Sequence, residues 1–271
     1  MEKSQLPGVM QVVAETYRDG VLAEMDDRVA IEEPLEIQVA LPDRDPALSV
    51  AVTMRTPGHD PDLALGFLYS EGAIDSMDQV AEVASLQGPN GGSLVRVTLS
   101  PGTPFDIHQF SRHVFTSSSC GVCGKQTIAR LMARVPCTDL GRPSFPSSFI
   151  LALPGKLRRA QAVFQQTGGL HAAALFDRDG TPLVLREDVG RHNALDKLVG
   201  YLLRENSLPL QEGMLMLSGR ISFELVQKAV MAGIPAIAAV GAPSSLAVTL
   251  ARDLGVTLIG FLRDGRFNRY L

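Results

Sequence analysis

The last third of the chain alternates short apolar segments with amphipathic ones, and this alternation constrains the fold more than any other feature. Helices are predicted over 193–204, 222–232 and 244–254, and strands over 214–217, 236–240 and 257–262. A helix over 156–166 and a hairpin of strands over 170–176 and 182–186 are predicted to precede them. Near-continuous apolar strands between helices are typical of a largely parallel sheet. We therefore expect an α/β fold whose ligands bind beyond the carboxyl ends of its strands.

The first 140 residues have a different pattern. Turn signals separate segments rich in β-forming residues, which predict strands over 12–16, 29–31, 35–40 and 48–54. A helix is predicted from Asp60, its N-cap, to Gly72, and the segment GPNGG predicts a hairpin. Residues 141–156 are rich in proline and serine, which is typical of a domain boundary. We expect a smaller, mainly β domain over 1–140, and an α/β domain over 141–271, giving an α+β chain overall.

Composition excludes several classes of function. The chain has 25 basic and 29 acidic residues among 271, a net charge of −4, so it has no overall positive charge for nucleic acid or an anionic membrane. The most apolar stretch, residues 234–242, is interrupted by proline and glycine and is far shorter than the roughly 18 residues of a membrane span. The first residues do not resemble a secretory signal. We therefore expect a cytoplasmic protein that binds neither nucleic acid nor membrane.

Two cysteines stand close together in the segment TSSSCGVCGK. Its serine and glycine content predicts a mobile, water-accessible loop at about 111–124 that exposes the thiols of Cys120 and Cys123. The start of a predicted helix and Lys125 follow directly, and both favour the thiolate form. This pattern indicates nucleophilic sulfur chemistry.

Other interpretations of the cysteines stay open. A structural zinc site would need four ligands, which Cys120, Cys123, Cys137 and one of His108 or His113 would supply. A second close cysteine pair is missing, so we predict no intrinsic metal. A dithiol oxidoreductase would use the same pair as a reversible disulfide. Cys137, which directly follows a proline, is interpreted as a packing residue.

Several polar turns in the second domain indicate an anionic ligand. SGRISFE and GAPSSLA each end a strand and open a helix, so Gly219 and Ser244 either contact phosphate or belong to ordinary helix caps. At His171, a core or edge histidine and a ligand contact are both open. Ala173 stands where zinc deaminases have glutamate, which argues against deaminase chemistry. Neither a P-loop nor a dinucleotide-binding glycine motif occurs.

Six segments together resemble the FdhD family of formate dehydrogenase accessory sulfurtransferases. They are RTPGHDPDLALGFLYSEG, SSSCGVCGK, TGGLHAAAL, REDVGRHNALDK, SGRISFELVQKA and GFLRDGRFNRY, and the match runs from about Arg55 to the C-terminus. The resemblance implies transfer of sulfur from a cysteine desulfurase to the bis(molybdopterin guanine dinucleotide) cofactor of molybdenum or tungsten formate dehydrogenases. The implied partners are the desulfurase, the catalytic subunit of formate dehydrogenase and a second copy in a homodimer. It also implies a cytidine-deaminase-like, three-layer α/β C-terminal domain.

The resemblance assigns roles to particular residues. Cys120 corresponds to the persulfide carrier and Cys123 to the second cysteine of the family motif. The candidate cofactor-binding residues are Phe261, Leu262, Arg263, Asp264, Gly265 and Arg266, together with Gly219, Ser244 and His171. GDP is the expected ligand mimic. A dithiol oxidoreductase and a cofactor-binding chaperone that moves no sulfur remain the alternatives.

Overall fold

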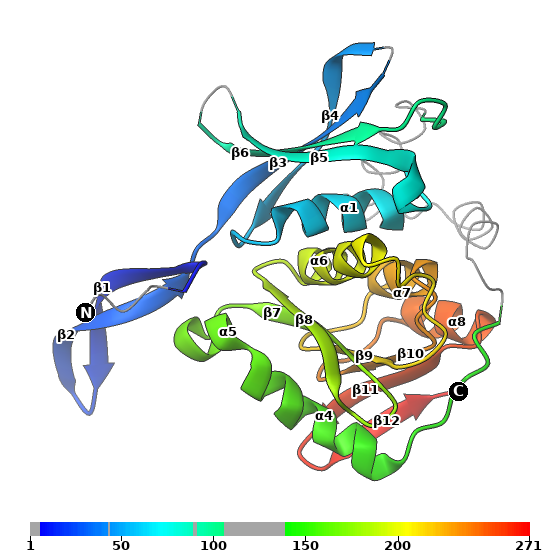
Figure 1. Cartoon of the computed structure of the whole chain (residues 1–271). Coiled ribbons are helices and arrows are strands. Elements are labelled where there is room, and N and C mark those ends of the chain that lie inside the picture. The colour runs from blue at the N-terminus through cyan, green and yellow to red at the C-terminus, as the bar shows by residue number, and fades with distance from the viewer. Residues whose placement is uncertain (1–5, 43, 89–90, 106–138) are drawn as a thin grey trace.

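The computed structural model describes residues 6–42, 44–88, 91–105 and 139–271 (Figure 1). The Cys-x-x-Cys segment and the other cysteine, Cys137, lie outside the described residues. The fold is a mixed α/β arrangement, as predicted. No helix within the described ranges combines the length and apolar character that crossing a membrane requires.

The second half of the chain builds a six-stranded sheet. Its order is β12 (Arg266–Tyr270), β11 (Thr257–Arg263), β10 (Ala236–Ala239), β9 (Met214–Leu217), β7 (His171–Phe176) and β8 (Pro182–Asp188). The three central strands β9, β10 and β11 run parallel, which confirms the expectation from the alternating region. The predicted hairpin is confirmed as β7 and β8. Strand β12 was missed, because the last strand predicted from the sequence is the one over 257–262.

Helices cover both faces of this sheet (Figure 1). Helices α6 (Arg191–Arg204), α7 (Phe223–Met231) and α8 (Ser245–Asp253) pack on the face that includes Leu215 and Ile237. Helix α4 (Ser147–Ala160) packs on the opposite face, against alternate residues such as Met216 and Ala238. Neighbouring residues of a strand point to opposite faces of the sheet, and here helices cover both faces. Consecutive residues of these strands are therefore apolar. The expected likeness to cytidine deaminase stays a prediction.

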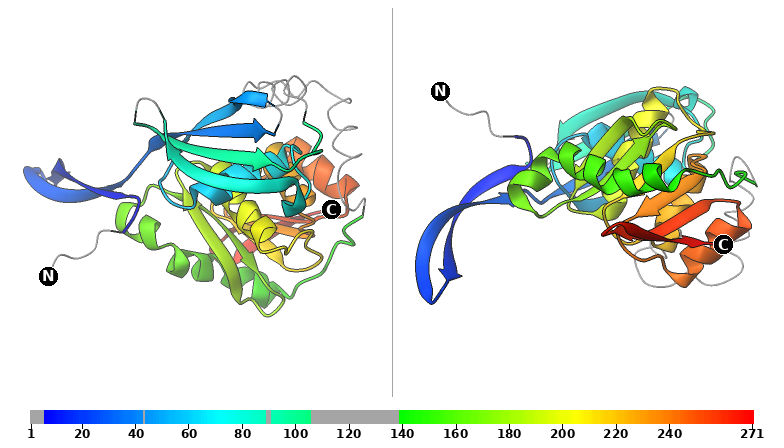
Figure 2. Two further views of the ribbon diagram at one scale, coloured as in Figure 1. Left: turned by 45° about the horizontal axis from the view of Figure 1, so that its top comes forward. Right: turned by 90° about the horizontal axis from the view of Figure 1, so that it is seen from below.

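The first hundred residues form two smaller sheets. One has the order β4 (Arg44–Arg55), β3 (Glu33–Leu41), β6 (Ser93–Leu99) and β5 (Val80–Gln87). The short 3-10 helix η1 (Met77–Gln79) directly precedes β5 in the chain. The pairing of β5 with β6 confirms the hairpin predicted at GPNGG. The other sheet is the hairpin of β1 (Val9–Arg18) and β2 (Val21–Ala30). It projects from the body beside α5 (Ala162–Thr167), as Figures 1 and 2 show.

Two expectations about helices were wrong in detail. Helix α1 (Asp60–Ser70) is capped by His59 in the left-handed conformation, and Asp60 instead pairs with Arg55 at 2.9 Å. The proline-rich segment predicted as a boundary is largely helical, because α4 begins at Ser147 and continues through Pro154. The helix predicted over 156–166 is therefore two helices, α4 and α5, that meet at Gln161.

Helices α1 and α6 lie against each other between the two larger sheets (Figure 1). They cross at Gly66 and Gly200, where an added Cβ would lie 1.8 Å from a backbone oxygen of the other helix. One continuous hydrophobic cluster contains buried residues of both sheets, such as Val97 and Leu217. The division into domains near residue 140 stays a prediction.

Candidate functional site

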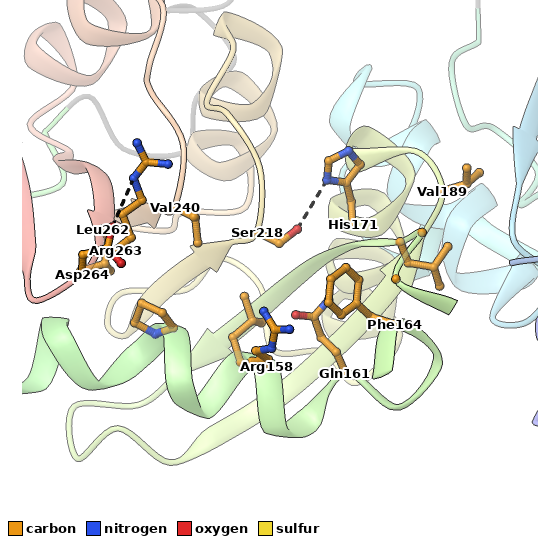
Figure 3. A pocket seen from close by; sticks show the side chains of 15 residues that line it. Arg158, Gln161, Phe164, His171, Val189, Ser218, Val240, Leu262, Arg263 and Asp264 are labelled. Atoms are coloured by element: carbon orange, nitrogen blue, oxygen red, sulfur yellow. Dashed lines mark hydrogen bonds and ion pairs between the residues drawn. The ribbon is translucent and has the colours of Figure 1, made fainter. Parts of the chain in front are cut away.

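A cavity of about 570 Å³ opens at the carboxyl ends of the parallel strands. Ser218 directly follows β9, Val240 follows β10, and Leu262 and Arg263 end β11. The opposite wall comes from α4 and α5, whose side chains face Ser218 and His171 in Figure 3. The cavity therefore occupies the edge at which the alternating pattern predicts ligand binding.

Four of the predicted cofactor-binding residues line this cavity. They are His171, Leu262, Arg263 and Asp264. Gly219 lies next to it, since a Cβ at this position would be 3.2 Å from the His171 ring. The remaining candidates Phe261, Gly265, Arg266 and Ser244 are not among the residues that line it. The hydroxyl of Ser244 accepts a hydrogen bond from Ala247 N at 3.2 Å, which confirms the helix-cap interpretation.

His171 is a neutral hydrogen-bonding group at one wall. Burial lowers its pKa, Arg191 lowers it further, and Asp188 opposes them. Its Nδ1 lies 3.5 Å from the hydroxyl of Ser218, which also accepts a hydrogen bond from Ala172 N at 2.8 Å. A neutral imidazole offers one donor and one acceptor to a ligand.

The strand ends beside the cavity are in close backbone contact. Gly241 N donates to Gly219 O at 3.0 Å, and Phe261 N donates to Gly241 O at 3.0 Å. A Cβ at Gly241 would lie 2.7 Å from Gly219 O, so a glycine is required there. The backbone N–H of Gly241 already donates within the protein, so it is not available to a phosphate bound at this turn.

The turn between β11 and β12 positions Arg263 and Asp264 at the cavity. Asp264 and Gly265 have φ values of 54° and 73° between the paired residues Arg263 and Arg266. Positive φ at both central residues is typical of a two-residue type I′ hairpin, for which Asp-Gly is a favoured sequence. The geometry places Arg263 toward the cavity and assigns Arg266 to the following strand.

The wall formed by α4 and α5 was not predicted from the sequence. Arg158, Gln161 and Phe164 line the cavity from these helices. Gln161 is only 4% exposed, and within the described residues its Nε2 has no hydrogen-bond partner. These residues face the cavity only because the chain bends at Gln161, between α4 and α5. The sequence pattern over 156–166 predicts one continuous helix and does not indicate that bend.

The polar cluster REDVGRHNALDK is ordered, but its central charges are used inside the protein. Asp188 pairs with Lys197 at 2.6 Å, and both side chains are at most 1% exposed. Asp188 also accepts a hydrogen bond from Thr56 N at 3.1 Å, and Lys197 donates to Thr56 O at 2.8 Å. This network attaches the segment that precedes α1 to helix α6.

A second contact joins the same cluster to SGRISFE. His192 Nε2 lies 3.2 Å from the Ser222 hydroxyl, which makes no cap hydrogen bond to its own helix. Burial, with Arg191 and Lys228, lowers the pKa of His192 to about 4. Ser222 therefore occupies the N-cap position of α7 without a side-chain cap hydrogen bond, and its hydroxyl instead joins two helix N-termini.

The positions that would carry sulfur or metal chemistry lie beyond the described ranges. They are Cys120, Cys123, Lys125, Cys137, His108 and His113. Among the described residues, no group of three or more metal-binding side chains is close enough to hold an ion. The zinc alternative depends on the undescribed residues and stays open.

Fold and site together define a mixed α/β protein with a ligand-sized cavity at the carboxyl edge of parallel strands. A family model described as the FdhD/NarQ family matches residues 30–271. The "Sulfur carrier protein FdhD" of Streptomyces avermitilis is 48% identical over 260 residues, covering 93% of this chain and 90% of the relative. The protein of the same name from Sulfurisphaera tokodaii is 45% identical, covering 97% and 96%.

A solved structure agrees with these relatives. The crystal structure of a candidate formate dehydrogenase accessory protein from Desulfotalea psychrophila aligns with a TM-score of 0.72. It is 27% identical, and the alignment covers 97% of both chains. The chain belongs to the FdhD/NarQ family, which confirms the resemblance drawn from its motifs.

Proposed function

We propose that this chain is a sulfur carrier and sulfurtransferase that serves formate dehydrogenases. The observation that carries the proposal is its identity of 48% and 45% to relatives named as sulfur carrier proteins, over 93% and 97% of its length. The pair Cys120 and Cys123 supplies the chemistry that the name requires. A cysteine desulfurase is the proposed donor.

The first step loads sulfur on Cys120. Its thiolate attacks the terminal sulfur of the desulfurase persulfide, and the sulfur–sulfur bond of that persulfide breaks. The desulfurase cysteine leaves as a thiolate, and Cys120 becomes a persulfide. No external oxidant or reductant is needed, because one sulfur–sulfur bond replaces another.

The second step releases the sulfur at the oxidation level of sulfide. The thiolate of Cys123 attacks the inner sulfur of the Cys120 persulfide, so a disulfide forms between the two cysteines and hydrosulfide leaves. The two electrons that bring the sulfur to the level of sulfide come from the two cysteines, which end as a disulfide. A reductant must then open the disulfide before the next cycle, a role that cellular dithiols perform in general.

We further propose that the cavity holds one guanine nucleotide end of the bis(molybdopterin guanine dinucleotide) cofactor, the substrate that receives the sulfur. Its volume of about 570 Å³ lies within the usual range for small-molecule sites and suits one nucleotide end. Arg263 offers a permanent positive charge for phosphate, and Ser218 and His171 offer hydrogen-bonding groups. The catalytic subunit of formate dehydrogenase would receive the product, and the carrier would act as a homodimer.

Intact-mass analysis tests the carrier step. After incubation with a cysteine desulfurase and cysteine, we expect the wild type to gain the mass of one sulfur, which a reductant removes. Cys120→Ala should gain none, whereas the matched variant Cys137→Ala should gain it as the wild type does. An undiminished adduct on Cys120→Ala would remove Cys120 from the role.

Activation of apo-formate dehydrogenase separates the alternatives. A sulfur carrier predicts loss of activation in Cys120→Ala. A chaperone that only shields the cofactor predicts full activation by a variant lacking both Cys120 and Cys123. A dithiol oxidoreductase predicts catalytic reduction of a test disulfide by the wild type, without any desulfurase.

A further inference from the structure

Gln161 is a buried polar residue at the junction of α4 and α5. It is 4% exposed, and among the described residues nothing accepts a hydrogen bond from its Nε2. A buried donor left unpaired costs free energy, and such groups in native proteins call for an explanation. Gln161 lines the cavity, so a ligand bound there would meet the unpaired amide.

Other residues already cap the two helices that meet at Gln161. The carboxylate of Glu187 accepts hydrogen bonds from Val163 N at 3.0 Å and Phe164 N at 2.9 Å, at the start of α5. Gln165 Nε2 donates to the carbonyl oxygens of Arg158 and Arg159, both at 3.0 Å, at the end of α4. The amide of Gln161 is therefore left to the cavity.

A second donor stands beside it. The guanidinium carbon of Arg158 lies 5.6 Å from the centroid of the Phe164 ring. Arg158, Gln161 and Phe164 lie together on the wall that faces Ser218 and His171 in Figure 3. An arginine side chain carries donors only, so this wall presents donors from both Arg158 and the Gln161 amide nitrogen.

We propose that Gln161 and Arg158 determine the specificity of this cavity by reading the acceptor edge of a guanine base. Guanine presents two acceptors, O6 and N7, along one edge, whereas adenine has an amino donor in place of O6. The base then lies at the α4–α5 wall, and the phosphates extend toward Arg263 at the end of β11. This inference rests on the proposed function, because it assigns the base contacts of the same cofactor end.

Calorimetric titrations with GDP, ADP and inorganic pyrophosphate test the assignment. The variant Gln161→Met keeps the length of the side chain and removes the donor. We expect GDP to bind it about tenfold more weakly, pyrophosphate to bind unchanged, and the preference for GDP over ADP to shrink. Gln166→Met is the matched control, because Gln166 lies outside the cavity and contacts Arg28 at 3.2 Å.

Thermal unfolding of the ligand-free protein gives a second readout. Removal of an unpaired buried donor should raise the melting temperature of Gln161→Met by a few degrees, although its GDP affinity falls. A purely structural role for Gln161 predicts the opposite change in stability. The variant Arg158→Met, which alters an exposed side chain, should also lose affinity for GDP more than for pyrophosphate.

The outcomes separate this inference from the proposed function. If the wild type binds GDP and Gln161→Met binds it equally well, the assignment of Gln161 is wrong and the cavity remains a cofactor site. Equal losses for GDP and pyrophosphate would assign Gln161 to phosphate and overturn base reading. If the wild type does not bind GDP, both the cofactor site and the base contacts are wrong.

Discussion

Substitution of Gly66 by alanine should force apart the two helices that join the larger sheets. A Cβ at Gly66 would lie 1.8 Å from the carbonyl oxygen of Asp196 and 2.8 Å from the amide nitrogen of Gly200. Ordinary van der Waals contacts begin near 3.4 Å, so α1 and α6 must separate by roughly 1.6 Å. Both obstructing atoms belong to the backbone, and a side-chain rotation cannot relieve the clash.

The expected cost follows from two opposing effects. Alanine is favoured over glycine inside a helix by about 1 kcal/mol. Overpacking a well-packed interior typically costs about 1–3 kcal/mol, and more where the backbone must move. The separation would also stretch the buried hydrogen bond that Ser70 Oγ on α1 donates to Asp196 on α6 at 3.1 Å. We expect Gly66→Ala to lower the free energy of unfolding by about 2–4 kcal/mol.

Urea and thermal unfolding measure this effect against a matched variant. Gly155 lies within α4, and the nearest atom to a Cβ there is Arg159 Nη1 at an ordinary 3.5 Å. Gly155→Ala should therefore leave stability unchanged or raise it by up to about 1 kcal/mol. Equal unfolding midpoints for the two variants would refute the close helix crossing.

Two further predictions concern buried charge. Asp188→Asn leaves the buried Lys197 without its counter-charge, so the free energy of unfolding in urea should fall by about 3–5 kcal/mol, and a fall below 1 kcal/mol would contradict a buried ion pair. For His192, the folded pKa of about 4 is below the ordinary histidine value of 6.5, so the unfolded chain binds more protons between these pH values and stability falls as pH falls through them. The histidine should cost about 2 kcal/mol between pH 7 and pH 5, a loss that His192→Asn removes; equal losses in both proteins would contradict the buried neutral imidazole.

The parallel strands were predictable because burial leaves a direct mark on them. Both faces of β9, β10 and β11 are covered, so nearly every residue is apolar and strand identity follows from composition. Strand β12 leaves no such mark, because it lies at the sheet edge with only exposed or partly buried residues, three of them charged or amide-bearing. The start of α1 was misassigned for a related reason: Asp60 suits an N-cap, yet tertiary pairing with Arg55 takes its carboxylate.

The candidate site was predictable on one wall only. His171, Arg263 and Asp264 stand at strand ends, and strand ends can be placed from apolar periodicity. The facing wall depends on a bend at Gln161, whose position is set by contacts of α4 with the sheet and of Glu187 with α5. Those contacts join residues far apart in the sequence, so no local pattern reveals them.

Some of the motifs on which the family resemblance depends hold the fold together. Asp188 and Lys197 enclose Thr56 in a buried network, so two of the quoted segments, around residues 55–62 and 186–197, hold the layers together. A charge that is fully paired inside the protein cannot also bind a ligand without large cost. The binding groups must therefore come from residues whose polar atoms are still free to pair, and in the described chain Gln161 meets that condition at the cavity. The unpaired amide, rather than the density of charged residues in a motif, is thus the better guide to where the substrate is recognised.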